Sequence, residues 1–176
     1  MWIKLNNLTR SVGFRGAGVS ALFFLACFST PEANAKDLHG RLGLGFNNQF
    51  SNSTTTNGVP GLSLKYGLTR DIAAAGIIGI STSTPSNTVT GLKLFKNIFF
   101  EQNLNFYFMV GGALVNGNHQ SGADFLGGFG SEFFIPGVES LGFSVETGVR
   151  FTNITGSFVF QTLGVSFLEA GIHFYF

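Results

Sequence analysis

The residues with the most obvious chemical capacity lie near the middle of the chain. His119, Ser121 and Asp124 are the three residue types that a hydrolase uses when an oriented base activates a serine. The surrounding segment is rich in Asn, Gly and Ser, which predicts an exposed loop. A loop of this kind does not hold a nucleophile and its base in a fixed geometry. We therefore expect these three residues to be solvated and the chain to have no catalytic site.

Two histidines and a glycine cluster are the other candidate sites. His39 and His173 fall on the segments that predict the first and last strands, where they could meet. As metal ligands they lack a third partner of suitable type, so we interpret them as a hydrogen-bonding pair and expect no metal and no cofactor. Gly127-Gly128-Phe129-Gly130 lacks the spacing and the following helix of a phosphate loop, and we attribute it to packing.

Charged side chains make up only 11% of the chain, and several of them share one feature. By the two-residue alternation of an extended strand, they fall on the face that carries glycines and small polar residues, opposite the Phe- and Leu-rich face. Four positive and three negative groups on one enclosed face must pair, because an unpaired buried ion is costly. We expect an interstrand ion-pair network made of Arg41, Lys65, Lys93, Glu132, Glu146, Arg150 and Glu169.

Eight consecutive segments with period-two alternation position these charges. Their lengths are near the ~9–11 residues that a tilted strand needs to cross a bilayer. They predict an all-β fold, an eight-stranded antiparallel up-and-down transmembrane β-barrel. Lys96 falls on the apolar face of its strand, where it either reaches the membrane edge or marks a bulge. The predicted segments are residues 38–50, 61–69, 72–81 (apolar on both faces), 89–100, 104–115, 125–134, 141–151 and a closing strand from about 163.

The connections between these segments alternate in kind. Three short ones carry charge or proline, at residues 70–71, 101–103 and 136–140. Transmembrane barrels have short periplasmic turns and longer outer loops, so we place the short turns on the side of both termini. The longer connections are rich in Ser, Thr, Asn and Gly and span residues 51–60, 82–88, 116–123 and 152–157.

The two faces of these strands distinguish a membrane barrel from a soluble ligand carrier, which buries its apolar face around a ligand. The chain contains 22 Phe and 25 Gly, and the glycines concentrate on the polar face. A narrow eight-stranded lumen holds glycines and a few long polar side chains, but it cannot hold rows of Phe and Leu. We therefore expect the Phe and Leu rows to face lipid.

The first 35 residues have the order of a secretory signal peptide. Three basic residues precede a short apolar stretch, and Ala33-Asn34-Ala35 supplies the cleavage motif. We predict that residues 1–35 are removed and that residues 36–176 form the barrel. The alternatives are a retained anchor helix and lipidation of Cys27, whose preceding residues fit a lipoprotein signal poorly. Cys27 is the only cysteine, so cleavage leaves a chain without a thiol.

The last strand carries the most specific motif. The pattern polar–x–Gly–x–x–aromatic–x–aromatic is filled by Glu169, Gly171, Phe174 and Phe176. It resembles the carboxy-terminal assembly signal of bacterial outer-membrane β-barrels, and the chain resembles the small eight-stranded family of OmpX and the OmpA transmembrane domain. The resemblance implies the outer membrane of a diderm bacterium, contact with its lipid, and recognition by periplasmic chaperones and the barrel assembly machinery. The chain departs from OmpA in lacking a periplasmic domain, and from OmpX in its short, uncharged outer loops.

These observations indicate a monomeric, non-enzymatic structural or surface barrel with a polar, ion-paired, largely plugged lumen. No basic run indicates a nucleic-acid partner. Two alternatives belong to other classes. One is a narrow, porin-like pore for small solutes, which conductance would reveal. The other is a lipid-modifying barrel enzyme, which a His converging with an acid or Ser at the outer-leaflet level of the wall would favour.

Overall fold

The computed structural model describes residues 36–48, 61–82, 86–117, 120–154, 156–162 and 169–176. The predicted signal peptide, residues 1–35, lies outside these ranges, and its removal stays a prediction. Within them, no helix is long and apolar enough to cross a membrane.

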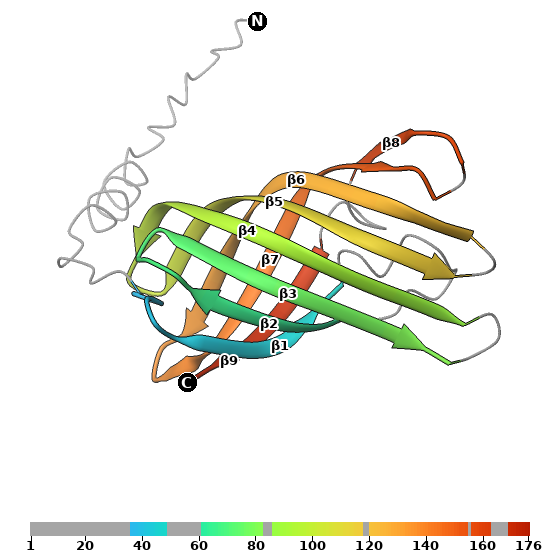
Figure 1. The fold of residues 1–176 in the computed structure, drawn as a ribbon. Coiled ribbons are helices and arrows are strands. Elements are labelled where there is room, and N and C mark those ends of the chain that lie inside the picture. The colour runs from blue at the N-terminus through green and yellow to red at the C-terminus, as the bar shows by residue number, and fades with distance from the viewer. Residues whose placement is uncertain (1–35, 49–60, 83–85, 118–119, 155, 163–168) are drawn as a thin grey trace, which may run out of the picture. The chain divides into compact units, whose positions relative to one another are not determined.

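Antiparallel strands make up most of the described chain (Figure 1). Their residue types explain the conformation, because β-branched and aromatic side chains alternate with small or polar ones. The nine strands of the described residues are β1 Leu42–Asn47, β2 Gly61–Gly67, β3 Ile72–Ser81, β4 Asn87–Glu101, β5 Leu104–Gly117, β6 Gln120–Ile135, β7 Val138–Thr152, β8 Val159–Thr162 and β9 Glu169–Tyr175.

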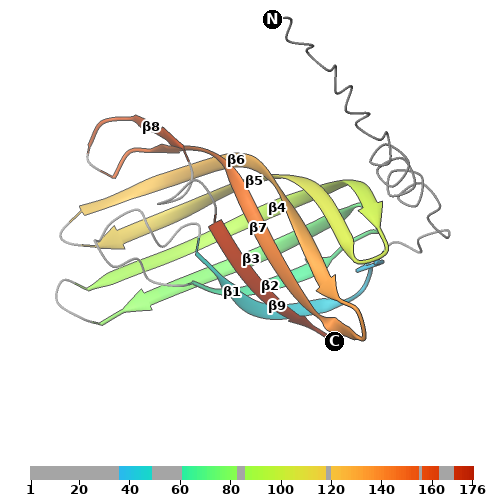
Figure 2. The same cartoon turned by 180° about the vertical axis from the view of Figure 1, so that it is seen from behind.

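These strands close into the predicted eight-stranded antiparallel barrel (Figures 1 and 2). Each strand from β1 to β7 pairs with the next one along the chain, β7 pairs with β9, and β9 pairs with β1. The short strand β8 pairs with the last residues of β7, next to the region that β9 pairs with. β8 and β9 thus occupy successive parts of the same edge of β7 and together supply the eighth position.

The barrel has two distinct ends. The short connections at residues 68–71, 102–103 and 136–137 lie at the same end as the C-terminus, as predicted, and we call this the turn end. At the opposite end, which we call the loop end, two of the connections between strands are shorter than the sequence predicted. β4 begins at Asn87 and β6 begins at Gln120, both inside predicted loops, so the hairpin between β5 and β6 leaves only residues 118–119 outside the strands.

The position of Lys96 is decided by two features at the turn end. Its Nζ lies 3.0 Å from Asp71 Oδ2, with both side chains about half exposed. One residue later the register between β4 and β5 shifts between Asn97 and Phe99, which is a bulge. Both explanations offered for Lys96 therefore hold. Its ammonium group reaches the end of the barrel, and a bulge shifts the register of β4 directly after it.

The burial pattern confirms that the Phe and Leu rows point outward. Leu44 is 44% exposed and Leu92 is 70% exposed, whereas Lys93 and Glu132 are each 1% exposed. The lumen is less uniformly polar than expected, because several apolar side chains also point inward. Those on β3 to β6 are Ala73, Ala75, Ile77, Val89, Phe95, Met109, Ala113, Val115, Leu126 and Phe134.

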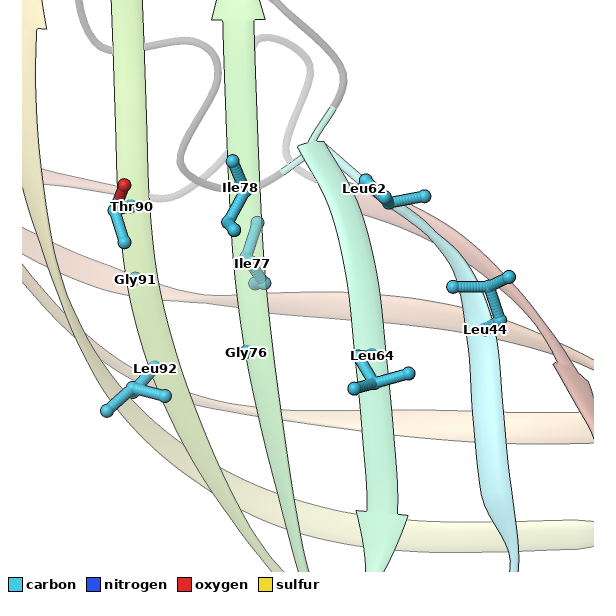
Figure 3. A pocket seen from close by; sticks show the side chains of 9 residues that line it. All are labelled: Leu44, Leu62, Leu64, Gly76, Ile77, Ile78, Thr90, Gly91 and Leu92. Carbon is cyan, nitrogen blue, oxygen red and sulfur yellow. The ribbon is translucent and has the colours of Figure 1, made fainter.

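The outer wall carries a shallow depression over β1 to β4 (Figure 3). It forms because Gly76 has no side chain between its cross-strand neighbours Leu64 and Leu92. The depression has a volume of about 510 Å³. A Cβ added at Gly76 would meet nothing closer than Leu92 Cδ2 at 3.9 Å, so this glycine is not required by packing.

Candidate functional site in the barrel lumen

Glu146 on β7 organises one half of a buried polar layer in the lumen. Its Oε2 lies 2.6 Å from Lys93 Nζ of β4 and also accepts a hydrogen bond of 3.2 Å from Asn47 Nδ2 of β1. The hydroxyl of Tyr107 on β5 donates a 2.7 Å hydrogen bond to its Oε1. Four strands therefore meet at one carboxylate, and charge-assisted hydrogen bonds of this length are the strong ones.

Glu132 on β6 organises the other half. Its Oε2 lies 2.8 Å from Lys65 Nζ of β2, and its Oε1 accepts a 2.6 Å hydrogen bond from the Tyr175 hydroxyl of β9. Strands β2 and β6 are four places apart in an eight-stranded barrel, so this ion pair crosses the lumen. The ammonium of Lys65 also lies 4.6 Å from the centre of the Phe95 ring, a cation–π contact.

These two ion pairs and two tyrosines form what we call the ion layer, namely Lys65, Lys93, Tyr107, Glu132, Glu146 and Tyr175. The two positive and two negative charges balance, and the tyrosines satisfy carboxylate oxygens that the lysines leave open. All six side chains are buried. In such surroundings each charge depends on its partner, because leaving one of them unpaired in a low dielectric is costly.

Glycines on the inward face make room for this layer. A Cβ added at Gly130 would lie 2.8 Å from Glu146 Cγ and 3.1 Å from Tyr107 Cε2. A Cβ at Gly128 would lie 2.1 Å from the backbone oxygen of Thr147. Close packing therefore explains Gly128 and Gly130 of the cluster, whereas a Cβ at Gly127 would meet nothing closer than the Met109 oxygen at 4.0 Å.

Of the remaining members of the predicted network, Arg150 and Arg41 lie away from the ion layer and Glu169 lies next to it. Arg150 pairs with Asp124, with Nη1 3.6 Å from Oδ2, and donates from Nη2 to Gln161 Oε1 at 2.8 Å. Arg41 lies partly exposed at the turn end, where its Nη2 donates to the backbone oxygen of Tyr175 at 3.3 Å. Glu169 is buried directly across from Glu146 in the pairing of β9 with β7.

Asp124 corrects the prediction of a solvated His119, Ser121 and Asp124 loop. Asp124 and Ser121 are strand residues of β6, and the Asp124 side chain is fully buried in the lumen. Ser121 is exposed and lies three positions away, on the opposite face of the strand. The two therefore cannot share a site, and His119 lies outside the described residues.

The expected meeting of His39 and His173 is wrong. His39 is exposed at the turn end, where it bridges to Gly67 of β2. His173 is buried on β9, with Nε2 2.9 Å from Ser63 Oγ and Nδ1 3.9 Å from Glu132 Oε1. The described residues contain no group of three or more His, Cys, Asp or Glu that could hold a metal.

The order Ser63, His173, Glu132 has the residue types of a hydrolytic triad, and sequence reasoning missed Ser63. All three side chains are buried in the lumen, and Glu132 is already bonded to Lys65 and Tyr175. They do not lie on the wall at the outer-leaflet level, which is where such a group would favour a lipid-modifying enzyme. A nucleophile needs access to its substrate, so this geometry reads as part of the polar layer.

One of the comparisons with known proteins bears on the fold. No protein-family model and no curated protein matches the sequence. Among solved structures, the N-terminal β-barrel domain of Pseudomonas aeruginosa OprF matches with 16% identity and a TM-score of 0.51, over 77% of this chain and 96% of that domain. The fold is that of a small outer-membrane-type β-barrel. At this identity the likeness concerns the fold alone.

The four residues of the carboxy-terminal motif divide between the two faces of β9 in this barrel. Glu169 is buried and Gly171 points inward. A Cβ at Gly171 would lie 2.5 Å from Ser144 Oγ, so a larger residue is disfavoured there. Phe174 and Phe176 point outward, 49% and 63% exposed, with ring centres 5.6 Å apart. The aromatic half of the motif is thus available on the outer wall.

Proposed function

We propose that this protein is a structural barrel of the bacterial outer membrane whose lumen is plugged by the ion layer, and that it has no catalytic role. The observation that carries the proposal is the pair Lys65–Glu132. Its two buried charges come from strands on opposite sides of the barrel and lie 2.8 Å apart within the lumen.

The outer wall supports a membrane location. Leu, Ile and Phe side chains between about 40% and 70% exposed cover the strands from β1 to β7 and β9. A contiguous apolar surface of this extent is unfavourable in water but matches the lipid-facing band of a transmembrane barrel. With the usual topology of such barrels, the turn end faces the periplasm and the loop end faces outward.

The ion layer supports a plug rather than a pore. Opening a path would separate Lys65 from Glu132 or Lys93 from Glu146, and each separation leaves buried charges without partners. Removing one partner of a buried pair typically costs about 3–5 kcal/mol. Both pairs and the closing seam form within one chain, so we propose that the barrel acts as a monomer.

The experiment that tests this proposal has two stages. Residues 36–176 are first refolded into detergent and examined for a shift in gel migration between unheated and boiled samples. The refolded protein is then added to planar lipid bilayers. We expect a migration shift and no stable conductance steps. A missing shift would contradict the membrane barrel, and a large, stable open channel in the intact protein would contradict the plug.

A further inference from the structure

The segment Lys36–Arg41, which we call the lid, does not continue strand β1, although its sequence alternates as the strand does. Gly40 has a φ of 72°, in the left-handed region that glycine adopts most readily. The backbone N–H of Arg41 donates to the Leu38 oxygen at 3.0 Å, which closes a tight turn. The chain therefore bends at the start of β1, at the turn end of the barrel (Figure 2).

The lid contacts strands from several sides of the mouth. The Leu38 side chain, 4% exposed, packs in one buried cluster with Phe134 of β6 and Tyr175 of β9. The Lys36 backbone oxygen accepts a 3.2 Å hydrogen bond from Asn105 Nδ2 of β5. These contacts place Leu38 over the interior of the mouth, next to the Tyr175 ring whose hydroxyl belongs to the ion layer.

On the side of β2, the backbone of the lid packs closely against Gly67. The N–H of Gly40 donates to the Gly67 oxygen at 2.9 Å, and the N–H of Gly67 donates to the Arg41 oxygen at 3.2 Å. A Cβ added at Gly67 would lie 1.9 Å from the Leu38 backbone oxygen. Only glycine at this position permits the lid to approach so closely.

From these contacts we propose that Lys36–Arg41 is a lid that seals the turn end of the lumen. It is a closure separate from the ion layer and in series with it. The lid reaches β2, β5, β6 and β9, so it lies across the opening instead of along one strand. Its function as a periplasmic seal rests on the membrane topology proposed above.

The lid is held more weakly than the ion layer. Its rim contact is the ion pair of Lys36 Nζ with Glu139 Oε2 at 2.7 Å, and the Glu139 side chain is 77% exposed. Exposed pairs of this kind contribute little to stability. The lid can therefore be displaced while the barrel and the ion layer stay folded, as expected of a locally opening segment.

Thiol labelling tests the seal directly. Asn105, 1% exposed beneath the lid, is replaced by cysteine in residues 36–176, which contain no other cysteine. The refolded N105C protein is exposed to a charged, water-soluble thiosulfonate reagent. We expect slow labelling with the lid in place, and labelling at least about tenfold faster when N105C is combined with Gly67→Ala or with deletion of residues 36–38.

Matched controls make the result decisive. Gly76→Ala adds the same methyl group to a neighbouring strand without a close contact, and it should leave the labelling of N105C slow. A cysteine at Val115, which is 1% exposed within the lumen, should stay unreactive in every background. A cysteine at Ser121, which is exposed, should always react quickly.

Two outcomes would overturn the lid. The first is labelling of N105C that is fast and is not accelerated further by Gly67→Ala or by deletion of residues 36–38, since N105C itself gives up the hydrogen bond to the Lys36 oxygen. The second is faster labelling of the Val115 cysteine in the Gly67→Ala background, which would mean that the barrel itself had opened. Labelling at Asn105 reports only the turn end of the lumen, whereas conductance reports the whole path. The lid and the proposed plug can therefore fail independently.

Discussion

The Tyr107 hydroxyl donates a 2.7 Å hydrogen bond to Oε1 of Glu146, the carboxylate whose other oxygen lies 2.6 Å from Lys93 Nζ. One side chain thus satisfies a phenol and an ammonium from two other strands. Tyr107 and Lys93 are 0% and 1% exposed, so water cannot take the place of a missing partner. The stability of the barrel should therefore depend strongly on the charge of Glu146.

Replacing Glu146 by Gln is the first prediction. The change keeps the side-chain size but leaves the Lys93 ammonium buried without its counter-charge, so we expect a loss of about 3–5 kcal/mol in the free energy of unfolding. The measurement is the fraction of heat-modifiable band across a urea series, since the only tryptophan is Trp2, in the predicted signal peptide. Lys93→Met added to Glu146→Gln should recover part of the loss. Identical urea midpoints for Glu146→Gln and the wild type would contradict this account.

The outward face gives a second prediction. Leu92 is 70% exposed near the middle of the outer wall, and its replacement by Arg should cost about 2–4 kcal/mol in a lipid bilayer. The measurement is urea unfolding from liposomes, with Ser121→Arg at the loop end as the control that should change little. If water and not lipid covered this wall, Leu92→Arg would stay within about 0.5 kcal/mol of the wild type.

The sequence alone was enough to predict which side chains of each strand point into the lumen and which point outward, and the reason is physical. A strand has only two faces, so the alternation of Phe and Leu with Gly and polar residues leaves one consistent assignment. That is why Lys65, Lys93, Glu132 and Glu146 could be placed in the lumen before the structure. Their individual partners could not be chosen, because pairing across a lumen depends on strand tilt and stagger, which alternation does not encode.

Three features were missed for related reasons. Asp124 lies in a polar stretch that predicts a loop, yet pairing with β5 and β7 carries the strand through it. Leu38 has the parity of outward-facing Leu42, but the positive φ of Gly40 turns it into the lumen. For Ser63, the sequence indicated only that its side chain points inward. Its contact with His173 arises because β9 lies next to β1, which brings His173 within reach of β2.

The closing seam yields a third prediction. A Cβ added at Gly45 of β1 would lie 1.7 Å from the backbone oxygen of Ile172 on β9, so one of the two strands must move. We expect Gly45→Ala to destabilise the barrel by about 1–3 kcal/mol, the usual cost of overpacking. The folded fraction on unheated gels is the measurement, and Gly76→Ala on the outer wall is the control. Equal folded fractions for the two variants would show that the seam tolerates the extra methyl group.

A fourth prediction separates exposed from buried charges. Asp71 and Lys96 are 47% and 56% exposed, and their 3.0 Å ion pair lies at the turn end. Water screens such pairs, so Asp71→Ala should lower the stability by less than about 1 kcal/mol. The same urea series checks this value. A loss as large as that of Glu146→Gln would show that the turn end, and not the ion layer, holds the barrel together.

The final residue supports a fifth prediction, about assembly in the cell. The backbone of Phe176 exchanges two hydrogen bonds with Leu42, at 3.0 Å and 3.3 Å, and these do not depend on its side chain. The ring itself is 63% exposed on the outer wall. If the barrel assembly machinery reads this aromatic group, its removal should affect assembly in the cell far more than the folded state.

We therefore expect Phe176→Ala to refold in detergent as well as the wild type does, while its level in outer-membrane fractions falls several-fold. Phe46→Ala is the matched control, because Phe46 is an outward-facing aromatic on the adjacent strand β1, 53% exposed, and lies outside the motif. Equal losses for the two variants in the cell would indicate a general need for apolar surface. A loss confined to Phe176→Ala ties recognition to the end of β9, where the exposed ring can be contacted before the seam with β1 closes.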